Sequence, residues 1–183
     1  MADLLDRVYR RLLVIRCQVG DRAAFEELVG LCQPRLRGFL HKLLPGGDRV
    51  DDVAQEVWLD VFRDLASLRD PEAFLPWFYR IAHNRAFRLL RSERRPMESI
   101  EEVNPADGGE DQPEFTPDDA RAVHAALDQL PVEQREALML RFMENMSYEQ
   151  IAVVAGCNVG TVRSRIHYAK LALHKIFKKA DEL

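Results

Sequence analysis

Hydrophobic residues recur at intervals of three and four along most of this chain, the spacing that places them on one face of an α-helix. The longest such stretch runs from Phe25 to Leu43 and ends at a Leu-Pro-Gly-Gly run, although Pro34 inside it is expected to bend or break the helix. A stripe of four valines predicts the next helix: Val50, Val53, Val57 and Val61. Both stretches predict helices with one buried face.

Further helices are predicted on either side of a break in the pattern. Pro76 fits the first turn of a helix over residues 77–91, after a turn at Asp70-Pro71. Later in the chain, the spacing predicts helices over residues 120–130, 132–143, 148–154 and 159–178. No segment shows a convincing alternation of polar and apolar residues, which strands would require. The pattern therefore predicts an all-α protein.

The break itself lies at residues 98–119, which hold nine acidic residues, no Lys or Arg, and few large apolar side chains. Such a segment cannot bury enough surface to offset the entropy of ordering it. We therefore predict two small helical domains, residues 1–97 and 120–183, joined by a flexible acidic linker over residues 98–119. The alternative is one domain with a long surface loop, but loops of this length are rare inside compact domains.

Composition narrows the class of protein. The chain has 183 residues, 47% of them hydrophobic, and a net charge of -4, which suits packed globular domains. Its apolar runs are too short to cross a membrane, its first residues do not match a secretory signal, and its three cysteines are widely spaced. We expect a soluble cytoplasmic protein with no membrane span, no metal and no cofactor. Its five histidines form no ligand motif and it has no glycine-rich phosphate loop, so an enzyme is not expected.

The charge is segregated along the chain. Six arginines and one acid lie within residues 80–95, and six basic residues with no acid lie within residues 160–179. Residues 48–64 reverse the sign, with six acids against two arginines. This distribution predicts two contacts with nucleic acid and one contact with a basic partner.

A local pattern near Ser147 is typical of a helix-turn-helix. Ser147 and Gln150 can form a capping box, in which each side chain satisfies the backbone amide of the other. Ala152 is the small residue needed where two helices cross, and Gly156 suits a turn with positive φ. Asn158 is predicted to cap a second helix, whose arginines can pair with guanine in the major groove. The alternative is an ordinary helical hairpin with a solvated basic face.

The segment over residues 74–91 combines five aromatic residues with arginines. Phe74, Phe78 and Ile81 share a helical face and are expected in the core, whereas Trp77 and Tyr79 cannot lie on the face of Phe78. At least one aromatic flank should therefore be exposed, where rings can stack on the bases of single-stranded DNA. The alternative is that the aromatic stripe is only core. A single-strand contact beside a duplex reader points to promoter opening.

These residues resemble the bacterial extracytoplasmic-function (group IV) sigma factors. The resemblance covers about residues 18–176 and is carried by GDRAAFEEL at 20–28, DVAQEVW at 52–58, FLPWFYRIAHN at 74–84, and the segment from LPVEQRE at 130–136 to GTVRSR at 160–165. It implies that residues 1–97 form the sigma-2 domain and residues 120–183 the sigma-4 domain. It also implies a transcription initiation factor that binds the clamp and flap of core RNA polymerase and promoter DNA, and that an anti-sigma factor could hold inactive.

The resemblance assigns each function to a set of residues. Reading of the −35 duplex falls to Thr161, Arg163, Ser164, Arg165, His167, Tyr168 and Lys170. Opening and holding of the −10 strand falls to Leu68, Arg69, Asp70, Trp77, Tyr79, Arg80, Asn84, Arg88 and Arg91. Polymerase binding falls to Asp52, Gln55, Glu56 and Asp60. The rival interpretation is a helix-turn-helix regulator that acts without polymerase, but it gives the acidic helix and the aromatic segment no role.

Overall fold

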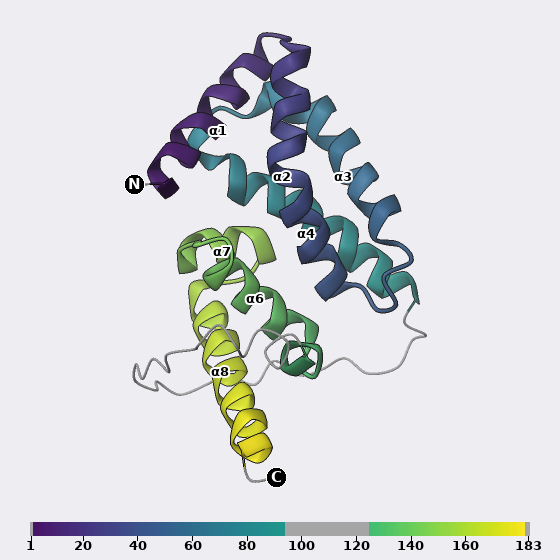
Figure 1. Cartoon of the computed structure of the whole chain (residues 1–183), viewed down its shortest axis with the longest axis vertical. Coiled ribbons are helices and arrows are strands. Elements are labelled where there is room, and N and C mark those ends of the chain that lie inside the picture. The colour runs from purple at the N-terminus through teal and green to yellow at the C-terminus, as the bar shows by residue number, and fades with distance from the viewer. Residues whose placement is uncertain (1, 94–124, 182–183) are drawn as a thin grey trace. The chain divides into compact units, whose positions relative to one another are not determined.

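The computed structural model describes residues 2–93 and 125–181, and the regular structure within these ranges is entirely helical. The chain divides after Arg95 into two compact units, which we name unit 1 and unit 2 (Figure 1). The prediction of an all-α fold with two helical domains is confirmed. The linker predicted at residues 98–119 lies outside the described residues, as does the predicted start of the second domain at residue 120.

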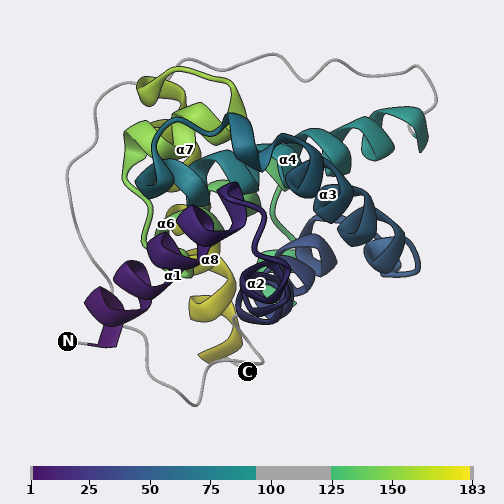
Figure 2. The same cartoon turned by 90° about the horizontal axis from the view of Figure 1, so that it is seen from above.

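The described part of unit 1 contains four long helices and two short 3-10 helices. They are α1 (Ala2–Gln18), α2 (Arg22–Leu43), α3 (Val50–Asp64), η1 (Leu65–Ser67), η2 (Pro71–Ala73) and α4 (Phe74–Glu93). Helix α2 packs against α1, α3 and α4, so it forms the centre of the unit (Figures 1 and 2). The four valines of the α3 stripe are buried, as predicted.

Helix α2 continues through Pro34, where a bend or a break was expected, so the helix is not broken there. A proline inside a helix costs about 3 kcal/mol or more. Seven side chains of α2 are buried, among them Leu28 and Leu36, and burial of each leucine contributes about 1.5–3 kcal/mol. Pro34 itself is exposed, so its ring leaves this packed face intact. Tertiary burial therefore outweighs the local preference.

Helix α1 has no counterpart among the predicted elements. It packs against α2 and buries Leu13 and Val14. Other large apolar side chains of α1 are exposed to solvent: Leu5, Val8, Tyr9, Leu12 and Ile15. Leu5, Val8, Leu12 and Ile15 recur at intervals of three and four, the spacing of one helical face, so the sequence carried a signal by which α1 could have been predicted.

In unit 2, residues 125–128 are helical, and α6 (Val132–Phe142), α7 (Tyr148–Ala155) and α8 (Val159–Asp181) follow. These bounds agree closely with the predicted helices. The three helices pack on one another around buried Leu140, Ile151 and Val162. Within residues 2–93 and 125–181, no helix is long and apolar enough to cross a membrane.

Candidate nucleic-acid and polymerase interfaces

The turn between α7 and α8 has the predicted helix-turn-helix geometry. The Ser147 hydroxyl accepts from the Gln150 amide at 3.2 Å, and the Gln150 side chain accepts from the Ser147 amide at 2.9 Å. Gly156 ends α7 with a φ of 63°, which is costly for residues with a side chain. Asn158 Oδ1 then accepts from the backbone amide of Thr161 at 2.7 Å and so caps α8. Local side chains therefore fix how α8 follows α7.

The two faces of α8 differ sharply. Its inner face is buried through Val162, Ile166, Ala169 and Leu173. The predicted DNA-contacting residues lie off this face: Arg163 and Tyr168 are exposed, and Thr161, Ser164, Arg165, His167 and Lys170 are half-buried. The structure thus brings all seven to the accessible side of one helix.

The two arginines of α8 lie in different surroundings. Arg163 is exposed, and its charge contributes to lowering the pKa of Glu149 on α7, after the backbone and Ser147 hydrogen bonds that Glu149 accepts. Arg165 is half-buried, and its Nη1 donates to the sulfur of Cys157 at 3.8 Å. Arg163 is therefore free to reach a base edge, whereas Arg165 is turned back toward the start of the helix.

In unit 1, the chain between α3 and α4 forms a structured loop, residues 65–73, with Leu68 half-buried and Arg69 and Asp70 exposed. Asp70 Oδ1 accepts from the amide of Glu72 at 2.9 Å and so starts η2. One carboxylate oxygen of Asp70 is thereby used inside the loop. Leu68, Arg69 and the second carboxylate oxygen of Asp70 remain candidates for contact with DNA.

An exposed polar stripe runs along α4. Arg80, Asn84, Arg88 and Arg91 are all exposed and follow one another at helical spacing, with half-buried Trp77 one turn before them. The predicted strand-contacting residues on α4 therefore share one face. Tyr79 is the exception, because it is only 1% exposed and its ring packs edge-on against Phe39 with centroids 5.0 Å apart. Tyr79 belongs to the core, which corrects its predicted place on the strand-contacting surface.

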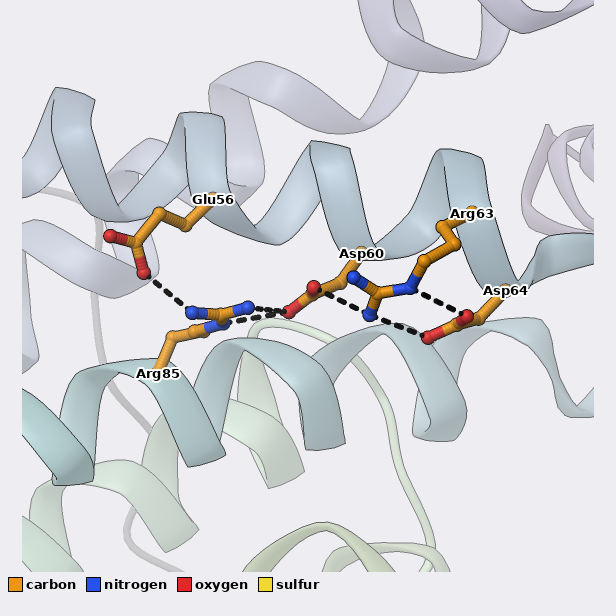
Figure 3. A network of polar contacts seen from close by, with 5 residues as sticks. All are labelled: Glu56, Asp60, Arg63, Asp64 and Arg85. Atoms are coloured by element: carbon orange, nitrogen blue, oxygen red, sulfur yellow. Dashed lines mark hydrogen bonds and ion pairs between the residues drawn. The ribbon is translucent and has the colours of Figure 1, made fainter.

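A network of charged side chains ties α3 to α4 (Figure 3). Arg85 of α4 donates to Asp60 Oδ2 at 2.6 Å and to Glu56 Oε2 at 2.8 Å, and Arg63 donates to Asp60 Oδ1 at 2.8 Å. The hydrogen bond to Asp60 is the main cause that raises the pKa of Arg85. Asp60 is 8% exposed, so it is not available on an open polymerase-binding face as expected. It instead joins two helices within the unit.

The remaining outer face of α3 carries the other predicted residues, since Asp52, Gln55 and Glu56 are exposed. Two apolar residues missed by sequence reasoning continue this face: Leu59 is 61% exposed and Phe62 is 68% exposed. Both lie off the valine stripe at the spacing of the acids, a signal that could have identified them. We name Asp52, Gln55, Glu56, Leu59 and Phe62 the outer face of α3.

Comparison with known proteins identifies both units. The family described as sigma-70 region 2 matches residues 28–96, and that described as sigma-70, region 4 matches residues 120–173. The chain is 39% identical to the RNA polymerase sigma-H factor of Pseudomonas aeruginosa over 175 residues, which covers 89% of this chain and 91% of that protein. It is 37% identical, with the same coverage, to the ECF RNA polymerase sigma-E factor of Escherichia coli.

Two solved structures are also similar. CnrH in complex with the cytosolic domain of CnrY matches with a TM-score of 0.66 and 25% identity, covering 93% of this chain and 98% of CnrH. The sigma factor RpoE of Bartonella quintana, in complex with the anti-sigma factor NepR, matches with a TM-score of 0.62 and 27% identity, covering 84% and 96% of the two chains. The chain belongs to the bacterial RNA polymerase sigma factors. Within them it is an extracytoplasmic-function sigma factor, a transcription initiation factor and not an enzyme.

Proposed function

We propose that this sigma factor joins core RNA polymerase and directs it to particular promoters through three separate surfaces. The outer face of α3 docks on the polymerase clamp. The loop over residues 65–73 and the polar stripe of α4 open the −10 element and hold its strand. The accessible side of α8 reads the −35 element as duplex, while unit 2 as a whole contacts the polymerase flap.

The observation that carries this proposal is that unit 1 presents two exposed faces of opposite character. Arginines with Asn84 and Trp77 suit a single strand, because cations hold the phosphates and an aromatic ring can stack on a base. Acids beside Leu59 and Phe62 suit a basic protein partner with an apolar patch. A regulator that bound duplex DNA alone would need only α7 and α8.

The proposal extends to regulation and place of action. Both similar solved structures hold a second protein, and one of these proteins is named an anti-sigma factor. We infer that a partner of this kind holds the present sigma factor inactive. Its site of action is the cytoplasm, where polymerase and promoter DNA are accessible.

Run-off transcription on a genomic promoter library tests the proposal in one assay. Core polymerase is supplied with the unchanged protein, with no added factor, or with a variant carrying Arg163→Ala and Arg80→Ala. We expect a discrete set of transcripts only with the unchanged protein. Specific duplex binding without any new transcript would favour the helix-turn-helix regulator instead.

A further inference from the structure

Helix α1 lies against both ends of the loop over residues 65–73, the loop that the proposed function places at the −10 strand. It contacts η1 at the start of the loop and η2 at its end. The residues proposed to meet DNA, Leu68 and Arg69, lie between these two points. The loop is therefore held from outside as well as by the helices that it joins.

At the start of the loop, the contact is made by Gln18, in the last turn of α1. Its Nε2 donates to the backbone oxygen of Leu65 at 3.2 Å and to that of Leu68 at 2.7 Å. The amide of Leu68 in turn donates to the Leu65 oxygen at 3.1 Å. Both polar groups of the Leu68 backbone are thus engaged, which fixes the direction in which its side chain leaves the chain.

At the end of the loop, two arginines of α1 converge on one carboxylate. Arg11 Nη1 donates to Glu72 Oε1 at 2.9 Å, and Arg7 Nη2 donates to Glu72 Oε2. The hydrogen bond from Arg7 is the main cause that lowers the pKa of Glu72. Glu72 is two residues from Asp70, whose side chain and backbone oxygen accept from the amides of Glu72 and Ala73.

We propose that α1 sets base selectivity at the −10 element, with Gln18, Arg7 and Arg11 as positioning residues that hold Leu68 and Arg69 in place against the unpaired strand. This inference rests on the proposed function. Exposed ion pairs contribute little to the stability of a fold. Their effect here is expected on the geometry of one loop, because selectivity requires side chains to be held close to one position.

The test uses full-length variants assembled with core polymerase and templates in which single −10 positions are varied. Gln18→Met removes the amide but keeps the length of the side chain, and Glu72→Gln removes the charge that the arginines share. We expect each to reduce the ratio of open complexes on preferred and changed bases about fivefold to tenfold, the range implied by the loss of one or two hydrogen bonds. Affinity for core and preference at −35 should be unchanged.

Three further variants separate positioning from a general loss of structure. Glu26→Gln, an exposed carboxylate in the same unit but outside the loop, should leave −10 selectivity intact. Arg7→Glu with Arg11→Glu should lower selectivity, and adding Glu72→Arg should restore it by reversing each ion pair. If Gln18→Met and Glu72→Gln still form open complexes and keep their −10 selectivity, the proposed role of α1 is overturned. The proposed function would still stand in that case. If the unchanged protein formed no open complexes, the proposed function itself would fall, and the inference with it.

Discussion

Arg163 and Arg165 lie two residues apart on α8, but only Arg163 is exposed to solvent. Arginines that pair bidentately with guanine discriminate between bases, whereas those on phosphates bind all sequences alike. The structure therefore favours Arg163 over Arg165 as the candidate for reading a base, a distinction that the sequence pattern does not make. Lys175, exposed further along α8, offers a contrast because its place suits a phosphate contact.

We predict that Arg163→Ala weakens binding to a matched −35 duplex by about 1–3 kcal/mol and relaxes preference at one base pair. Arg165→Ala should have a smaller effect, since its guanidinium is engaged with Cys157. Fluorescence anisotropy on matched and scrambled duplexes measures both, with Lys175→Ala as the variant that weakens all sequences equally. Equal losses on the two duplexes for Arg163→Ala would rule out base reading by this residue.

Asp60 and Asp52 lie on the same helix but are expected to behave in opposite ways. Asp60→Ala removes a nearly buried partner of Arg63 and Arg85, so it should lower the free energy of unfolding by about 1–3 kcal/mol in chemical denaturation. Asp52→Ala should change stability much less, because the ion pair of Asp52 with Arg49 is exposed.

Affinity for core polymerase should depend on Asp52, whereas the free energy of unfolding should depend on Asp60. Asp52→Ala, and Leu59→Ala further along the same face, are expected to weaken binding to core without loss of stability, since both side chains lie on the outer face of α3. Titration of labelled core measures this. Loss of stability in Asp52→Ala would contradict this division between a structural Asp60 and a polymerase-binding outer face of α3. Full affinity for core in both Asp52→Ala and Leu59→Ala would contradict it too.

At the scale of elements, we expect the exposed stripe of α4 to act in strand opening rather than in initial binding. We predict that Asn84→Ala leaves closed complexes intact but reduces open complexes, measured by the permanganate reactivity of unpaired thymines. A template with a preformed bubble should recover most of the activity, because the cost of unstacking the bases is removed. Ser92→Ala, exposed at the end of α4, is the matched control. A defect that persists on the bubble template would place Asn84 outside the opening step.

A feature of the fold could be predicted from the sequence where the interactions that form it lie within a few residues of one another. The helix-turn-helix was predictable because Ser147, Gln150, Gly156 and Asn158 act within a few residues of one another. The core position of Tyr79 was not, since it depends on Phe39 of α2 lying against α4. Asp60 likewise has the spacing of a surface acid, and only the approach of Arg85 from another helix encloses it. The positions of Tyr79 and Asp60 are set by packing between helices, which a local sequence pattern does not reveal.

At the scale of the whole molecule, charge is divided into three blocks. Residues 1–97 carry 17 basic and 14 acidic residues, residues 98–119 carry nine acids alone, and residues 120–183 carry 9 basic and 7 acidic residues. An acidic segment between two basic parts can compete with DNA for both. Such competition requires close approach, because the Debye length is about 8 Å at physiological salt.

We predict that neutralising five acids of this segment strengthens DNA binding by the free protein, most of all at low salt, and weakens its hold on core. The five are Glu101, Glu102, Glu110, Asp111 and Glu114, each replaced by Gln or Asn. Binding measured over a salt series gives both the affinity and its salt slope, with Asn104→Ser and Gln112→Ser as the neutral control. An unchanged slope would leave the segment with no electrostatic role.

The pairing of Asp60 with Arg85 also predicts how these two positions vary among related sequences. The two residues are 25 positions apart in the chain but share one partly buried site between α3 and α4 (Figure 3). Loss of either residue leaves the other with only its exposed second partner, Arg63 for Asp60 or Glu56 for Arg85. Loss of both, with apolar side chains filling the space, can be neutral. Among related proteins, a substitution at one of the two positions should therefore persist only when the other position is also substituted. Positions 60 and 85 are therefore expected to covary among orthologues, whereas position 52, on the outer face of α3, is expected to vary with the polymerase surface and not with position 85.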